Sequence, residues 1–173
     1  QAIACGLADR RIDLDQQEPL WQLLGSESFA DGAAVKDFVY SKLIAASAEP
    51  VMAKAEIDRY VSLDSVGAIV AALEAADSDW ERTTAATLRK RSPLMLHVVL
   101  EQVRRARSMD LADDLRMERD MVRHCFFLRP GRSETLEGIR ALAVDKDHAP
   151  QWQPARIEEV SDAMVAPFFD SPW

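Results

Sequence analysis

SPLMLHVVLEQVRRAR, residues 92–107, carries the clearest helical pattern in the chain. Ser92 can cap the helix, and Pro93 occupies the first turn, where its missing N–H is not needed. The arginines collect at the end of the segment, where cations suit the negative end of the helix dipole. The segment predicts a helix that is at least half buried. Its predicted apolar stripe consists of Met95, Leu96, Val99, Leu100 and Val103.

Helical patterns continue on both sides of this segment. The spacing predicts a helix over 110–128, ended by the Pro130-Gly131 turn, and Ser133 can cap the helix that follows. Upstream, Ser78-Asp-Trp-Glu81 has the spacing of a capping box. The residues predicted to be buried in these helices are Val66, Ile69, Val70, Leu73, Leu111, Leu115, Val122, Cys125 and Phe126.

The first third of the chain also predicts helices, over 2–8, near 20–24 and over 33–47. No segment alternates β-branched and polar residues over five or more positions, as a half-buried strand would. The pattern therefore predicts an all-α chain of seven to nine helices, without an internal repeat.

Composition excludes several classes of function. Of 173 residues, 48% are apolar and 29% charged, as in a soluble globular protein, and the formal charge of −8 argues against nucleic acid as the main partner. No apolar run approaches the roughly 20 residues of a membrane span. Two cysteines make no disulfide framework, so a reducing, cytoplasmic compartment is expected. The chain begins with Gln1 and we expect it to be a piece of a longer protein.

The chemistry-bearing residues do not form a recognisable catalytic set. His97, His124 and His148 lie far apart without a second ligand at metal spacing, so we predict no metal site. There is no nucleophile elbow, phosphate loop or dinucleotide motif, and we predict no catalytic residue in the chain. Glu118, close to an apolar stripe, is interpreted as a structural carboxylate. A group of basic residues could attract an anion, although such runs are more often solvated helix ends: Arg89, Lys90, Arg91, Arg104, Arg105 and Arg107.

Lys146 allows two interpretations. It follows a predicted helix and lies between Asp145 and Asp147, so it could complement the helix dipole and form local ion pairs. Alternatively, a fixed cation at a helix end could contact a phosphate or a purine. Chemistry alone favours the local ion pairs.

The second half of the chain resembles a known family. RSPLMLHVVLEQVRRAR, MERDMVRHCF and ETLEGIRALAVDKDHAPQWQPARIEEV are similar to the C-terminal region of the 3-hydroxyisobutyryl-CoA hydrolases, a branch of the crotonase (enoyl-CoA hydratase/isomerase) superfamily. AIACGLADRRID, at the start, is similar to a segment that follows the catalytic layers in crotonases. Where the family usually has an aspartate, this chain has Glu134, and Ser133 is expected to cap the helix instead. The matching residues in the third segment are Glu137, Gly138, Arg140, Ala141, Asp145, Lys146, Asp147, Pro150, Trp152 and Pro154.

The resemblance implies an architecture. It implies that the chain is the helical C-terminal part of a crotonase-type protein, with the upstream α/β spiral core absent from the chain. Residues 1–90 would form a helical segment following that core, and residues 91–173 a helical lid and association region. The core of the same protein would then be a partner of the chain, and a homo-oligomer is possible.

The resemblance also implies a function. The parent protein would be a 3-hydroxyisobutyryl-CoA hydrolase of valine catabolism, with acyl-CoA as its substrate and no cofactor, and this chain alone would be inactive. Lys146, with Leu142 as its apolar neighbour, falls where a lysine of crotonases approaches the CoA adenine or phosphates. One alternative is an enoyl-CoA hydratase/isomerase, and another is a non-enzymatic helical interaction module. Neither nucleic acid nor a membrane is expected as a partner.

Overall fold

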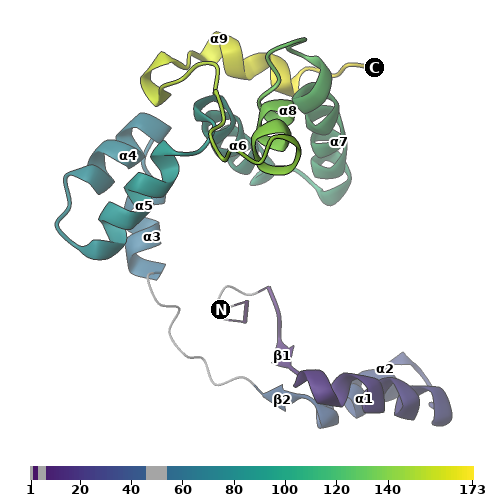
Figure 1. The fold of residues 1–173 in the computed structure, drawn as a ribbon. Coiled ribbons are helices and arrows are strands. Elements are labelled where there is room, and N and C mark those ends of the chain that lie inside the picture. Colours follow the sequence, from purple (N-terminus) through teal and green to yellow (C-terminus); the bar gives the residue numbers. More distant parts are fainter. Residues whose placement is uncertain (1, 4–6, 46–53) are drawn as a thin grey trace. The chain divides into compact units, whose positions relative to one another are not determined.

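The computed structural model describes residues 2–3, 7–45 and 54–173 (Figure 1). The chain divides into two compact units, Gln1–Ile57 and Asp58–Trp173. The boundary predicted between 90 and 91 falls within the second unit, and the roles predicted for the two segments stay predictions.

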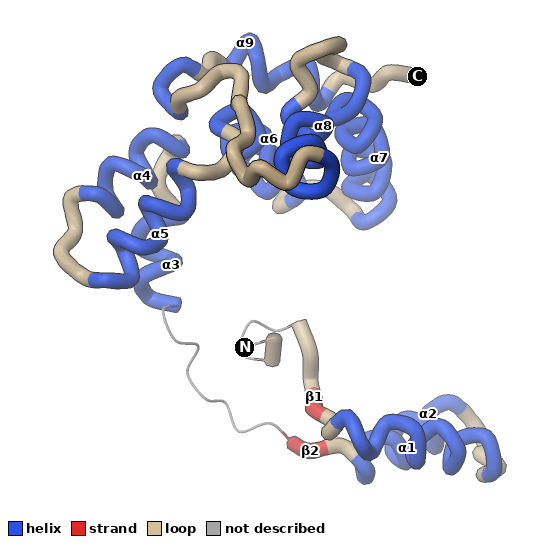
Figure 2. The backbone as a smooth tube through the Cα atoms, in the orientation of Figure 1, coloured by secondary structure: helices blue, strands red, loops and turns tan. Residues whose placement is uncertain are grey.

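The first unit pairs two helices with a two-stranded antiparallel sheet. Its elements are β1 (Arg10–Arg11), α1 (Leu14–Ser26), α2 (Gly32–Lys42) and β2 (Ile44–Ala45). Arg10 pairs with Ala45, and Arg11 pairs with Ile44. These are the only strands in the described part of the chain, and Figure 2 shows them in red. Neither α1 nor α2 contains a buried residue.

The all-α fold class is therefore wrong as stated. Strands of two residues are too short to produce the alternation by which a strand is recognised in a sequence. The helix predicted over 33–47 ends at Lys42, and residues 46 and 47 lie outside the described residues. Residues 2–3 and 7–8, within the first predicted helix, are not helical, and residues 4–6 lie outside the described residues.

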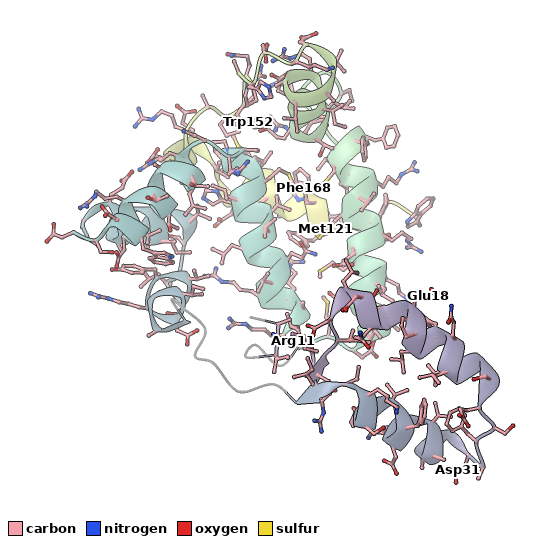
Figure 3. All side chains as sticks on the ribbon, turned by 60° about the horizontal axis from the view of Figure 1, so that its bottom comes forward. Arg11, Glu18, Asp31, Met121, Trp152 and Phe168 are labelled. Atoms are coloured by element: carbon pink, nitrogen blue, oxygen red, sulfur yellow. The ribbon has the colours of Figure 1, made fainter. Side chains whose placement is uncertain are left out.

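The second unit is built of helices and helical turns. α3 (Lys54–Val61) begins just before it, and the elements that follow are α4 (Val66–Glu74), α5 (Asp79–Arg89), α6 (Pro93–Ala106), α7 (Leu111–Phe127), α8 (Glu134–Ile139), η1 (Arg140–Val144), η2 (Ile157–Glu159), α9 (Asp162–Val165) and η3 (Ala166–Phe169). Three apolar clusters hold this unit together. One joins α6 and α7 to α9 and η3, and consists of Leu94, Val98, Met117, Met121, Val165 and Phe168 (Figure 3). The others centre on Leu73 and on Val70.

The buried faces of α6 and α7 match the predicted ones only in part: Met95, Leu96, Leu100 and Cys125 are partly buried against the apolar clusters, and other predicted positions are not. On α6, Leu94 and Val98 are fully buried, whereas Val99 and Val103 are 49% and 51% exposed. On α7, the buried apolar residues are Met117 and Met121. The predicted positions Leu111, Leu115 and Val122 are all exposed. Both helices carry apolar residues on more than one face, so periodicity alone does not select the face that meets the core.

The predicted caps are partly confirmed. Ser92 Oγ accepts from Met95 N–H at 3.2 Å, and Ser133 Oγ accepts from Leu136 N–H at 3.1 Å. The prediction of a capping box at Ser78 and Glu81 is wrong, because the Ser78 side chain forms no cap hydrogen bond. Glu81 is instead buried, and the hydroxyl of Tyr60 donates to its Oε1 at 3.0 Å.

Candidate functional site

The segment from Arg140 to His148 has an unusual backbone. η1 is a π-helical turn, in which Asp145 N–H donates to the Arg140 carbonyl at 2.8 Å. Lys146 and His148 then adopt left-handed φ angles of 56° and 54°. Such conformations cost a non-glycine residue about 1–3 kcal/mol and cluster at functional sites, as π turns do. This turn is therefore the first candidate for a site.

The guanidinium of Arg140 holds the turn. Its Nη1 donates to Asp145 Oδ2 at 2.6 Å and to Asp147 Oδ2 at 2.7 Å. It also donates to Glu137 of α8, from Nε to Oε2 at 2.9 Å and from Nη2 to Oε1 at 2.7 Å. Nη2 also donates to the Ala149 carbonyl at 3.3 Å. One side chain thus connects the helix to both ends of the turn.

These contacts bear on the first interpretation of Lys146, the local ion pairs. Both flanking aspartates pair with Arg140, and within the described residues Lys146 forms no ion pair. The local ion pairs that chemistry alone favoured are therefore not formed. The side chain of Lys146 is exposed, so its ammonium group is available to bind an anion.

The charges around Arg140 shift the protonation of its partners. Hydrogen bonds from Arg140 and from Gln151 N–H lower the pKa of Glu137 from its ordinary 4.5 to about 2. The bond from Ala149 N–H, followed by Arg140, lowers the pKa of Asp147. Glu137, Asp147 and Asp145 together raise the pKa of Arg140. Glu137, Asp147 and Arg140 are therefore charged at neutral pH.

Buried Glu134 anchors the start of α8. Its Oε2 accepts from the Ser92 hydroxyl at 2.6 Å, and its Oε1 accepts from Gln153 N–H at 3.0 Å. Arg129 lies 3.5 Å from Oε1. Ser133, besides capping α8, donates to the Cys125 carbonyl at 2.6 Å. The start of α8 is thus tied to α6, to the end of α7 and to the chain that leaves the turn.

Trp152 fixes the chain where it leaves the turn. Its Nε1 donates to the Lys90 carbonyl at 3.1 Å. A Cβ added to Gly138 would lie 3.4 Å from Cη2 of Trp152, so the ring packs closely on the helix backbone. Figure 3 shows Trp152 beside α8. Gly138 is therefore a point of close packing, and Trp152 anchors the chain as it leaves the turn.

A cavity of about 530 Å³ lies against this anchored helix. Leu142, which is 66% exposed, contributes apolar surface to it. Trp152 supplies an aromatic wall, and Lys90 and Arg91 line the cavity without forming an ion pair among the described residues. The remaining lining residues are Thr135, Gly138, Ile139, Ala141, Ala143, His148 and Pro150. The cavity suits a ligand with a flat apolar part and negative charges.

The structure separates the predicted basic group. Arg89 forms ion pairs with Glu74 at 2.8 Å and with Glu158 at 2.6 Å. Arg105 pairs with Glu101 at 2.7 Å, and Arg104 donates to the Leu63 carbonyl at 3.2 Å. Of the run at 89–91, only Lys90 and Arg91 line the cavity. The sequence showed the charges, but only the folded chain shows which of them are already paired.

Other candidate groups have structural partners. His97 Nδ1 lies 2.9 Å from the Pro93 carbonyl, and His124 Nε2 lies 2.7 Å from the Asp170 carbonyl. Gln102 donates to Glu118 at 3.2 Å, which agrees with the structural interpretation of that carboxylate. Burial raises the pKa of the Cys125 thiol.

Two kinds of site are not found in the described ranges. No three His, Cys, Asp or Glu side chains there are placed to hold a metal ion. None of the helices described is both long and apolar enough to span a bilayer.

Comparison with curated proteins finds relatives named as 3-hydroxyisobutyryl-CoA hydrolases and one named as a ribosomal protein. Small ribosomal subunit protein mS47 of Arabidopsis thaliana is 36% identical over 98% of this chain and 43% of its own length. Probable 3-hydroxyisobutyryl-CoA hydrolase 2 of the same plant is 32% identical over 98% of this chain and 47% of its own length. The chain thus spans less than half of either protein.

Comparison with solved structures corrects the fold class further. The crystal structure of an enoyl-CoA hydratase from Rhodobacter sphaeroides matches with a TM-score of 0.76 and 28% identity. The match covers 99% of this chain and 47% of that one. The mainly helical chain therefore has the fold of the matching part of a crotonase-type hydratase, which replaces the predicted all-α class.

The family model described as Enoyl-CoA hydratase/isomerase matches residues 1–169. Almost the whole chain therefore carries the sequence pattern of that family. The chain belongs to the enoyl-CoA hydratase/isomerase, or crotonase, family and to its 3-hydroxyisobutyryl-CoA hydrolase branch.

Proposed function

We propose that the chain belongs to a 3-hydroxyisobutyryl-CoA hydrolase of valine catabolism and that it contributes part of the acyl-CoA-binding surface. Lys146 would contact a phosphate of CoA, and Leu142 would pack on its adenine. The groups that cleave the thioester would lie outside these 173 residues. A cytoplasmic location and a homo-oligomer stay predictions.

The uncompensated charge of Lys146 is the observation that carries this proposal. A lysine between two aspartates would ordinarily be neutralised by them, but here Arg140 takes both carboxylates. Lys146 does not line the cavity, but His148 of the same turn does, together with Lys90, Arg91 and the exposed surface of Leu142. CoA offers phosphates to such cations and a flat purine to such a surface.

Kinetics of the complete protein test the proposal. Lys146→Gln should raise KM for 3-hydroxyisobutyryl-CoA about tenfold with kcat nearly unchanged, because a remote phosphate contact binds substrate and transition state alike. The 173-residue chain alone should show no thioester hydrolysis. Turnover by this chain alone, or an unchanged KM in the variant, would contradict the proposal.

Hydratase chemistry is a second candidate, favoured by the likeness to the Rhodobacter sphaeroides enoyl-CoA hydratase. The two activities differ in their products, since hydrolysis releases free CoA thiol and hydration does not. Release of thiol from the hydroxyacyl-CoA without hydration of an enoyl-CoA would select the hydrolase.

A non-enzymatic role is the third candidate, favoured by the relative named as a ribosomal protein. In that case the protein would sediment with a ribosomal subunit and would show neither reaction. Activity in the free protein would exclude a purely structural role.

A further inference from the structure

Every N–H of the Arg140 guanidinium is used. An arginine side chain has five such donors in a planar fork. Nε makes one bond, to Glu137, and Nη1 makes two, to Asp145 and Asp147. Nη2 makes two more, to Glu137 and to the Ala149 carbonyl. An arginine that only capped a helix end would not need acceptors on both sides of the following turn.

The acceptors surround Lys146 in sequence. Asp145 and Asp147 are its immediate neighbours, and Ala149 closes the turn by donating its N–H to Asp147 Oδ1 at 2.9 Å. The turn keeps Lys146 in the left-handed region, which is unfavourable for a residue with a Cβ. A conformation of this kind persists only where its surroundings hold it in place. The hydrogen bonds of Arg140 to Asp145, Asp147 and the Ala149 carbonyl hold the turn in this conformation.

We propose that Arg140 is a positioning residue for Lys146. By binding both flanking aspartates it prevents them from pairing with the lysine, and it fixes the turn so that the ammonium is available to an anionic group of the ligand. This inference rests on the proposed contact between Lys146 and a phosphate of CoA. Arg140 itself touches no ligand in this account.

A double-mutant cycle separates this role from a general contribution to folding. CoA affinity is measured by isothermal titration calorimetry on the complete protein, as wild type, Arg140→Gln, Lys146→Gln and the double variant. Each single variant should bind CoA about tenfold more weakly, the loss typical of one charge-assisted contact. The double variant should bind no more weakly than Lys146→Gln, because Arg140 acts through the lysine.

A rescue variant tests the mechanism directly. In Arg140→Gln the two aspartates are free to pair with Lys146, so adding Asp145→Asn and Asp147→Asn should recover about threefold or more of the lost affinity. Asp147→Asn keeps a side-chain oxygen that can accept from Ala149 N–H. If Arg140→Gln does not fold, Arg140→Lys replaces it in both experiments, since lysine keeps the charge but has only three donors.

Arg105→Gln is the matched control. Arg105 also pairs with a carboxylate, Glu101, and its side chain is 39% exposed against 32% for Arg140. Its replacement should leave CoA affinity unchanged.

The outcomes distinguish the two proposals. Unchanged CoA affinity in Lys146→Gln, or no binding of CoA to the complete wild-type protein, would overturn the proposed contact and this inference with it. A loss in Lys146→Gln without a loss in Arg140→Gln would overturn the inference alone. Additive losses in the double variant, or no rescue by the two aspartate substitutions, would do the same.

Discussion

α1 and α2 of the first unit and α6 and α7 of the second are helices of comparable length, with 13, 11, 14 and 17 residues. They differ in what surrounds them. α6 and α7 bury residues against each other and against α9 and η3, whereas α1 and α2 bury none. In the first unit, order comes from local contacts, such as the Asp31 carboxylate accepting from Ala34 N–H at 2.8 Å.

This difference shows that helical periodicity and core formation are separate properties. Local caps and pairs contribute about a kcal/mol each, whereas a buried leucine contributes several. The same kind of truncation should therefore have very different effects in the two units.

The largest effect is expected in the core of the second unit. Leu94→Ala should lower the free energy of unfolding by about 2–5 kcal/mol, because a fully buried side chain leaves a cavity. Urea unfolding followed by circular dichroism measures this loss. Val99→Ala on the same helix, where the side chain is exposed, should cost less than about 1 kcal/mol. Equal losses would mean that α6 packs through the face that its sequence first suggested.

The next largest effect concerns the buried carboxylate at the start of α8. Glu134→Ala should lower the free energy of unfolding by about 2–4 kcal/mol, because the Ser92 hydroxyl and Gln153 N–H lose their acceptor. Glu118→Ala, on the exposed face of α7, should stay within about 0.5 kcal/mol in the same urea experiment. A neutral result for Glu134→Ala would show that apolar packing alone holds α8.

A smaller effect should appear as a dependence on pH. Arg140 and Gln151 N–H depress the pKa of Glu137 from 4.5 to about 2, so its contribution to stability is complete above pH 4.5 and is lost as the pH falls towards 2. Thermal unfolding at pH 5 and pH 3 should show a decrease in Tm that is smaller in Glu137→Gln. Because the cluster is open to solvent, added salt should also reduce the decrease. An identical decrease in wild type and variant would contradict the role of this pair.

The smallest effect is expected in the first unit. Trp21 is 69% exposed on α1, and Trp21→Ala should change the free energy of unfolding by less than about 0.5 kcal/mol in urea. A loss approaching that of Leu94→Ala would show that this helix acquires a buried face in solution and would remove the contrast between the units.

The sequence predicts well what depends on neighbouring residues. Ser92 and Ser133 cap their helices as predicted, since an N-cap needs only its own side chain and an amide three residues on. Capping failed at Ser78, where Glu81 has a buried partner, Tyr60, that lies 21 residues away. Tertiary contacts of this kind override a local pattern.

The site was predictable only in part. The family resemblance pointed to Lys146 and Leu142, and Gly138 and Trp152 are among the residues that match the family segment. The role of Arg140 depends on a π turn and two left-handed residues, for which the sequence carries no glycine signal. The positive charge at the cavity depends on which of the basic residues remain unpaired, and that is a property of the folded chain.

Nuclear magnetic resonance of the ¹⁵N-labelled chain titrated with CoA tests the central claim most directly. We expect amide shifts over 142–149 and 90–91 and a shift of the Trp152 indole N–H, all much reduced in Lys146→Gln. Shifts confined to other parts of the chain, or the same shifts in Lys146→Gln as in wild type, would contradict the claim that this turn is a binding site for the anionic part of CoA.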